Sequence, residues 1–210
     1  MKTGIFYGSA TGTTAQIAEK IGKLLNVDGV DIHDVANTAP SEVGKYDVLI
    51  MGSSTWGDGE LEDDWYDFIA GVEALDIKGK KVALCGCGDE IMTDTFCNAV
   101  GELHDRLEPT GCTFIAPYDT IGYTFEESKA KPGDALEAYG LLLDEVNHPE
   151  LTAPRLAGWT TIVRESASCG APTARRHIPA TIPAYPRRIP AESISEPKIA
   201  ATFFCTSCKE

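Results

Sequence analysis

A run of small and hydroxyl-bearing residues lies near the start of the chain, between an apolar stretch and a helical pattern. It comprises Gly8, Ser9, Ala10, Thr11, Gly12, Thr13 and Thr14. The hydroxyls can donate to an anion, and the first turn of the following helix offers unpaired N–H groups and partial positive charge. The run therefore predicts a phosphate site with neutral donors, since it holds no Lys or Arg. A helix N-cap with a chance run of hydroxyls explains the same residues equally well.

Two other kinds of phosphate loop do not fit this run. It lacks the G-x-x-x-x-G-K-[ST] pattern, so the lysine of a P-loop triphosphatase is missing. Its glycines also miss the G-x-G-x-x-G spacing of a dinucleotide site.

Two later loops carry residues suited to a flat aromatic ligand. In the loop 53–61, Trp56 lies among small residues at the expected end of a strand, where it could stack on a ring. The loop 86–89 is small enough for backbone to approach a ligand closely. Trp65, in contrast, sits in a helical pattern and is expected in the core.

The elements that must position these loops alternate along the chain. Strands are expected at 3–7, 30–33, 47–51, 81–85, 113–116 and 139–143. Helices are expected where large residues recur at helical spacing, in four sets: Ile17, Ile21, Leu24 and Leu25; Trp65, Phe68 and Ile69; Phe96, Val100, Leu103 and Leu107; and Leu151, Arg155, Leu156 and Trp159. Pro154 is expected in the first turn of the last helix. Such alternation predicts an α/β fold with a parallel sheet, where ligands bind at the carboxyl ends of the strands.

Composition and charge narrow the class of protein further. Hydrophobic residues make up 43% and charged residues 24%, which is ordinary for a globular protein, and no apolar run approaches a membrane span. The N-terminus lacks signal-peptide features, so a cytoplasmic protein is expected. Residues 1–159 hold 28 acidic against 11 basic residues. That excess disfavours nucleic acid and anionic membranes and favours basic protein surfaces, although solubility alone could explain it.

The cysteines argue against a disulfide scaffold. There are seven, an odd number, and they follow no framework spacing. Cys85, Cys87, Cys97 and Cys112 lie in or beside apolar segments, where a free thiol behaves as a small hydrophobe.

Taken together, the three loops resemble the FMN-binding loops of flavodoxins. The similarity continues through residues 122–130, 140–145, 151–152 and 155–159, and resembles the insertion in the fifth strand of long-chain flavodoxins. Each fragment is weak alone, but they occur in register over residues 1–159. The resemblance implies a doubly wound five-stranded parallel sheet of order 2-1-3-4-5 with helices on both faces.

The resemblance also implies roles for individual residues. Residues 9–14 hold the FMN phosphate, Trp56 stacks on the flavin ring, and the carbonyl of Gly57 turns to accept a hydrogen bond from N5 of the half-reduced flavin. The expected cofactor contacts are Ser9, Ala10, Thr11, Gly12, Thr13, Thr14, Ser54, Thr55, Trp56, Gly57, Cys87, Gly88, Asp89, Met92 and Cys97. Backbone near Gly88 and Asp89 is expected at the pyrimidine edge. No catalytic residue and no metal site are expected.

One position departs from the family pattern. Family members usually carry a tyrosine three or four residues after the position of Asp89, where it covers the other ring face. This chain has Met92 and Thr93 there. Met92 can cover the ring through a sulfur–aromatic contact; otherwise that face is open.

The resemblance implies a low-potential one-electron carrier that uses FMN. Excess negative charge disfavours the fully reduced, anionic flavin, and a monomer is expected to dock on basic-faced flavin reductases and iron–sulfur oxidoreductases. The alternative is a flavodoxin-like NAD(P)H or quinone oxidoreductase, yet His33, His104 and His148 look isolated and no nicotinamide site is visible. A phospho-receiver domain is a third reading, disfavoured because strand-end aspartates for Mg²⁺ are missing.

The C-terminal part of the chain does not match the family. Residues 160–163 are expected to add one helical turn before 166–170 end the helix. Residues 1–165 are therefore expected to form the FMN-binding domain, and 166–210, with half of the chain's twelve prolines within 160–210, an irregular, disordered tail. Cys205 and Cys208 have the spacing of half a zinc site.

Overall fold

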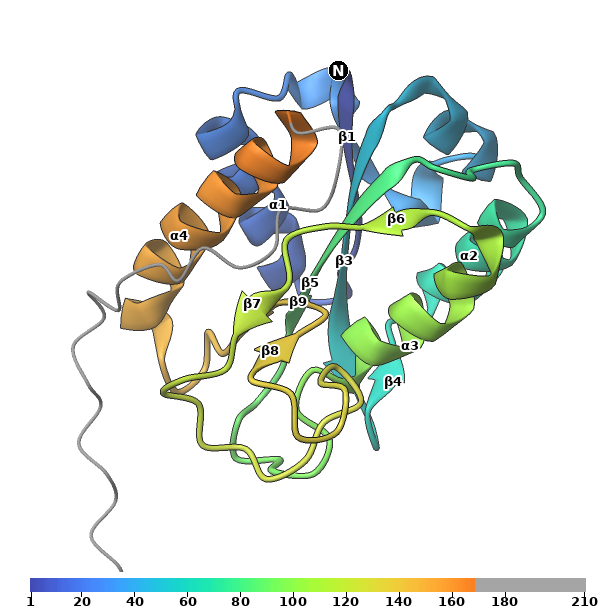
Figure 1. Cartoon of the computed structure of the whole chain (residues 1–210). Helices are drawn as coiled ribbons and strands as arrows, with labels where there is room; N and C mark the ends of the chain where they lie inside the picture. The colour runs from blue at the N-terminus through green and yellow to red at the C-terminus, as the bar shows by residue number, and fades with distance from the viewer. Residues whose placement is uncertain (169–210) are drawn as a thin grey trace, which may run out of the picture. The chain divides into compact units, whose positions relative to one another are not determined.

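The structure is a computed structural model that describes residues 1–168, and its central feature is a largely parallel sheet (Figure 1). The parallel strands are β1 (Thr3–Gly8), β2 (Ile32–Asp34), β3 (Val48–Trp56), β5 (Lys81–Cys87), β6 (Thr113–Phe114) and β9 (Gly140–Leu143). Their order is β2-β1-β3-β5, with β6 and β9 both pairing with β5. The expected order 2-1-3-4-5 is confirmed, with β6 and β9 together taking the fifth place.

The fifth strand is split by the insertion. Its first piece, β6, pairs with β5 at Lys81 and Val82, and β9 pairs with β5 from Leu84 to Cys87. Between them, β7 (Tyr118–Asp119) and β8 (Glu137–Ala138) form a separate antiparallel pair. This pair was not predicted, because strands of two residues carry no periodic signal.

In residues 1–168, four helices cover the two faces of the sheet. Helices α1 (Thr13–Leu25) and α4 (Pro149–Ser168) lie on one face, and α2 (Asp64–Glu73) and α3 (Asn98–Leu107) on the other (Figure 1). Short 3-10 turns are η1 (Gly29–Asp31), η2 (Val35–Asn37), η3 (Pro40–Lys45) and η4 (Glu108–Thr110). The expected placement of helices on both faces is confirmed.

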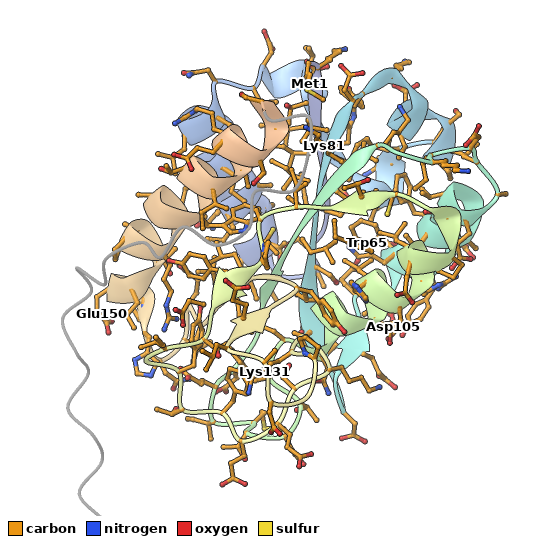
Figure 2. All side chains as sticks on the ribbon, in the orientation of Figure 1. Met1, Trp65, Lys81, Asp105, Lys131 and Glu150 are labelled. Carbon is orange, nitrogen blue, oxygen red and sulfur yellow. The ribbon has the colours of Figure 1, made fainter. Side chains whose placement is uncertain are left out.

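The core consists of two apolar clusters, one on each side of the sheet. Alternating strand residues divide between them, so that Ile5 and Ile50 face α1 and α4 while Phe6 and Met51 face α2 and α3. Trp65 is fully buried, as expected, and its Nε1 donates to the Gly52 carbonyl at 3.1 Å (Figure 2). None of the helices in residues 1–168 combines the length and apolar character that a membrane span requires.

Two strands run further than expected. The apolar pattern ended β3 at Gly52 and β5 at Cys85, but β3 continues to Trp56 and β5 to Cys87. The polar extension of β3 is held by β4 (Glu60–Leu61), which pairs antiparallel with Thr55 and Trp56. Backbone pairing, rather than apolar side chains, extends this strand.

The last helix also differs from the expectation. It begins at Pro149, so Pro154 lies inside the helix rather than in its first turn, and it continues to Ser168, beyond the expected boundary at 165. The Lys81 ammonium donates to the Ser166 and Ala167 carbonyls at 2.9 and 2.7 Å, which satisfies groups that a helix end leaves unpaired (Figure 2). Cys205, Cys208 and the rest of the expected tail lie outside the described residues.

Candidate functional site

The three loops singled out in the sequence meet at one edge of the sheet. In the parallel register, Gly8 at the end of β1 pairs with Ser53 of β3, which in turn pairs with Gly86 of β5. The hydroxyl run follows Gly8, the β3–β4 turn follows Trp56, and the Gly88–Asp89 segment follows β5. The carboxyl ends of adjacent strands thus bring the predicted contacts together.

The hydroxyl run curves into the N-terminus of α1. Gly12 is the N-cap residue in a left-handed conformation (φ 88°), and its N–H donates to Ser9 Oγ at 3.1 Å. No side chain caps α1, and its first turn holds no acidic residue. The first N–H groups of this 13-residue helix therefore remain available to an anion. The helix-cap reading of these hydroxyls is not what the geometry shows.

Two buried hydroxyls at this edge lack a hydrogen-bond partner within the described part of the chain. They are Thr14 Oγ1, in the first turn of α1, and Thr55 Oγ1, near the end of β3. The Cys87 thiol interacts weakly with Thr14, and a thiol is a poor substitute for an oxygen acceptor. Buried hydroxyls are seldom left unpaired, because desolvation costs about 1–3 kcal/mol. Both residues, together with the uncapped helix, fit a phosphate group.

Trp56 lies at the tip of the β3–β4 hairpin, with 43% of its surface exposed. Its Nε1 donates to Ser54 Oγ at 2.9 Å, which orients the indole. Gly57 and Gly59 have positive φ, and the Gly59 N–H closes the turn on the Trp56 carbonyl at 2.9 Å. An exposed tryptophan held by its polar edge can present a ring face to a flat ligand.

The segment after β5 is anchored by residues that sequence reasoning missed. Asp89 Oδ1 accepts from Asn147 Nδ2 at 2.8 Å and from the Ile91 N–H at 2.9 Å, while the Gly88 N–H donates to the Leu143 carbonyl at 3.0 Å. The Asp89 carboxylate is therefore occupied within the protein. Backbone at Gly88 and Asp89 is what this segment can offer a ligand, in line with the expectation.

A buried polar network continues behind this segment. Asp144 accepts hydrogen bonds from the N–H groups of Glu90, Val146 and Asn147, and these bonds hold the pKa of Asp144 below its usual range despite burial. Glu90 accepts from the Thr124 N–H of the insertion, and its carboxylate lies 3.5 Å from His148 Nε2. The network joins the segment after β5, the β9–α4 loop and the insertion. Asp144 and Glu145 drew notice only through the resemblance.

The remaining predicted contacts divide by exposure. Met92 is 49% exposed beside the exposed Ile91, whereas Cys87 is buried and Cys97 has no exposed surface. A Cβ added at Gly88 would lie 3.1 Å from Cys97 Sγ, so this thiol packs directly behind the Gly88 backbone. We expect Cys97 to support that backbone rather than to touch a ligand. Burial raises the pKa of both thiols, which keeps them protonated.

The three histidines are not isolated surface residues, contrary to the expectation. His33 Nε2 lies 2.6 Å from the Tyr46 hydroxyl, and burial lowers the pKa of His33. His104 stacks on Tyr139 with ring centroids 3.6 Å apart. His148 belongs to the network above. All three are partly buried and serve packing or hydrogen bonding, a context that residue spacing could not reveal.

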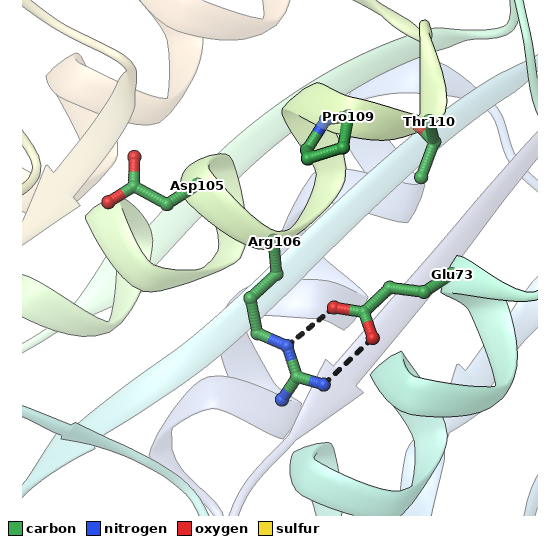
Figure 3. Close-up of a pocket in the computed structure, with 5 residues that line it drawn as sticks. All are labelled: Glu73, Asp105, Arg106, Pro109 and Thr110. Carbon is green, nitrogen blue, oxygen red and sulfur yellow. Dashed lines mark hydrogen bonds and ion pairs between the residues drawn. The ribbon is translucent and has the colours of Figure 1, made fainter.

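A hollow of about 370 Å³ lies elsewhere, where the C-terminal ends of α2 and α3 meet (Figure 3). Its lining includes Arg106, whose guanidinium makes two hydrogen bonds to the Glu73 carboxylate, at 2.7 and 3.0 Å. Helices that follow parallel strands return to the opposite edge of the sheet, so this hollow is separate from the loops that carry the candidate site.

Comparison with known proteins identifies the family. The flavodoxin family model matches residues 5–159. Flavodoxin 1 of Escherichia coli strain K12 is 44% identical over 164 residues, covering 78% of this chain and 93% of the relative. Flavodoxin of Haemophilus influenzae is 43% identical over 157 residues, covering 74% and 90%.

A solved structure gives the same result. The crystal structure of Fusobacterium nucleatum flavodoxin bound to flavin mononucleotide superposes with a TM-score of 0.72 at 32% identity, covering 79% of this chain and 99% of that one. The sequence-based resemblance is confirmed. This chain belongs to the flavodoxin family, whose members are electron-transfer flavoproteins that carry FMN.

Proposed function

We propose that this chain is a low-potential one-electron carrier that binds FMN across the carboxyl ends of β1, β3 and β5. FMN, when bound, supplies a group that takes up and releases electrons singly. The observation that carries the proposal is the pairing of an uncapped α1 N-terminus with the unpartnered hydroxyls of Thr14 and Thr55. One phosphate group could accept hydrogen bonds from the N–H groups of the helix N-terminus and from both hydroxyls.

Residues at the phosphate end hold the cofactor in place. The N–H groups of the first turn of α1 and the hydroxyls of Ser9, Thr11, Thr13, Thr14 and Thr55 donate to the phosphate oxygens, while Ala10 and Gly12 keep the loop compact. The donors are all neutral, so the helix N-terminus supplies the positive potential.

Residues at the ring end orient the flavin and set its surroundings. Trp56, fixed by Ser54, stacks on one ring face, and Met92 lies over the other. Gly57 has a positive φ and no Cβ, so its peptide can turn toward the flavin N5. Backbone at Cys87, Gly88 and Asp89 contacts the pyrimidine edge.

The charge around the ring end favours a basic partner. The segment just after Trp56 carries four exposed acidic residues: Asp58, Glu60, Asp63 and Asp64. Such a rim steers the carrier, acting as a monomer, toward basic faces of flavin reductases and iron–sulfur oxidoreductases. The same charge disfavours a second electron on the flavin, which lowers the potential of that step.

The test is reconstitution followed by spectroscopy. The protein is expected to retain flavin absorption bands after FMN addition and gel filtration, and to elute as a monomer. It is expected not to oxidise NADH or NADPH without a reductase. Failure to retain FMN would contradict the cofactor assignment, and rapid direct oxidation of NADPH would favour the oxidoreductase alternative.

A further inference from the structure

One ionisable side chain beside the phosphate loop has no role in the function described so far. Glu62 follows β4 and is buried, with 4% of its surface exposed. Its N–H donates to Ser53 Oγ at 3.3 Å, and its Oε2 accepts from the Asp64 N–H at 3.2 Å in the first turn of α2. The backbone of Glu62 is therefore tied to β3, and its carboxylate is tied to the start of α2.

The Glu62 carboxylate packs against the end of β1. A Cβ added at Gly8 would lie 2.5 Å from Glu62 Oε2 and 2.5 Å from the Trp65 ring. Ser9, the first residue of the phosphate loop, follows Gly8 directly. A buried carboxylate thus touches the backbone that leads into the anion site.

Within residues 1–168, no basic side chain from the elements packed against this carboxylate balances its charge. The phosphate loop, β1 and the end of β3 place no charged group beside it, and the charged neighbours that act on it are Asp63 and Asp64. Burial, followed by these carboxylates, raises the pKa of Glu62 to about 6. Glu62 therefore changes charge in the range where a phosphate monoester loses its second proton.

We propose that Glu62 couples FMN binding to proton uptake. The ionised carboxylate of Glu62 repels the phosphate held by the neighbouring loop, whereas the protonated carboxyl group does not. The proposal rests on the proposed function, because it assumes the phosphate lies in residues 9–14. Two anionic groups that share a poorly solvated site cannot both be ionised without cost. Glu62 is thus a determinant of affinity for the phosphate and not a contact of the flavin ring.

The experiment compares wild type, Glu62→Gln and Asp67→Asn as full-length apoproteins titrated with FMN and with riboflavin between pH 5 and pH 8. Glutamine keeps the shape of Glu62 and can still accept from the Asp64 N–H, but carries no charge. Asp67→Asn removes an equal charge from an exposed position on α2, where solvent and salt screen it. Riboflavin lacks the phosphate, so it reports on the ring end and on the integrity of the fold.

The expected result is specific to FMN and to high pH. At pH 5, Glu62→Gln and wild type bind FMN with equal affinity, and at pH 8 the variant binds about tenfold more tightly. Riboflavin affinity and the FMN affinity of Asp67→Asn show no such pH-dependent difference from wild type. Comparing the variants with wild type removes the phosphate's own titration, which all three proteins share.

Two results would overturn the inference while leaving the proposed function intact. One is an FMN affinity ratio between Glu62→Gln and wild type that stays constant from pH 5 to pH 8. The other is an equal change for riboflavin, which would show that the substitution acts through the fold. If wild type binds no FMN at any pH, the proposed function itself fails.

Discussion

The two ends of the candidate flavin site are built differently. At the phosphate end, an uncapped helix and two unpartnered buried hydroxyls, Thr14 and Thr55, are already in place within the core of the fold. At the ring end, Trp56 and Met92 are 43% and 49% exposed. The first end is preorganised for an anion, and the second is open to solvent and to partners. From this difference we expect affinity to arise mainly at the phosphate and the ring end to serve electron exchange.

Removing the ligand's phosphate should have the largest effect. Riboflavin is expected to bind about 1000-fold more weakly than FMN, which corresponds to losing two or three charge-assisted hydrogen bonds. Fluorescence titration of the apoprotein with both ligands measures the ratio. Comparable affinities would reverse the comparison and place the binding energy at the ring.

Removing one hydroxyl at the phosphate end should have the next largest effect. Thr14→Val keeps the side-chain shape and is expected to weaken FMN binding by about 2 kcal/mol, since a charge-assisted hydrogen bond is lost. Riboflavin affinity should stay unchanged. The apoprotein should lose little stability, because there the hydroxyl has only a weak interaction with the Cys87 thiol.

Thr113→Val, at an exposed position on β6, is the matched control and should alter neither affinity. Equal loss of FMN affinity in both variants would show that the Thr14 hydroxyl has no special role.

The buried carboxylate of Glu62, near the phosphate end, should make the stability of the apoprotein depend on pH. Because folding raises the pKa of Glu62 to about 6, the folded state binds more protons than the unfolded chain, and Glu62 costs stability as pH rises from about 4.5 to about 6. The free energy of unfolding of Glu62→Gln, relative to that of wild type, should therefore rise by about 2 kcal/mol between pH 4 and pH 7.5. Urea unfolding of the two apoproteins at both pH values measures it; parallel pH dependence would contradict the assignment.

Replacing the methionine over the second ring face by an aromatic ring should have the smallest effect. Met92→Tyr is expected to tighten FMN and riboflavin binding alike by about 1 kcal/mol, since an aromatic pair adds roughly that much beyond burial. Leu136→Tyr, at an exposed position before β8, is the control. A gain for FMN but not for riboflavin would mean that Met92 does not lie over the ring.

The same contrast appears in what the sequence could predict. The alternation of strands and helices, the helices on both faces and the meeting of three loops followed from apolar periodicity and from the short motifs, whereas the strand order followed from the resemblance to flavodoxins. The features read from local patterns rest on signals such as the continuous apolar run that begins β3 and the glycines at 8, 12 and 57. The hydroxyl run 9–14 could be singled out because its residues are contiguous, whereas Thr55 comes from a different strand.

What the sequence could not reveal depends on contacts between distant residues. The extension of β3 to Trp56 needs pairing with β4, and the anchoring of Asp89 needs Asn147, 58 positions later in the chain. Glu62 is buried in the fold, with its Oε2 packed against Gly8 of β1, 54 positions earlier in the chain. A carboxylate between Leu61 and Asp63 reads as part of a solvated acidic segment until the fold is known.

The central claim is that this chain binds FMN and exchanges electrons one at a time at low potential. A potentiometric titration of the FMN-loaded protein, followed by absorbance, tests it most directly. The account predicts two separate one-electron steps, with a half-reduced flavin accumulating between them and a second potential well below that of free FMN. A single two-electron step at the potential of free FMN would contradict it.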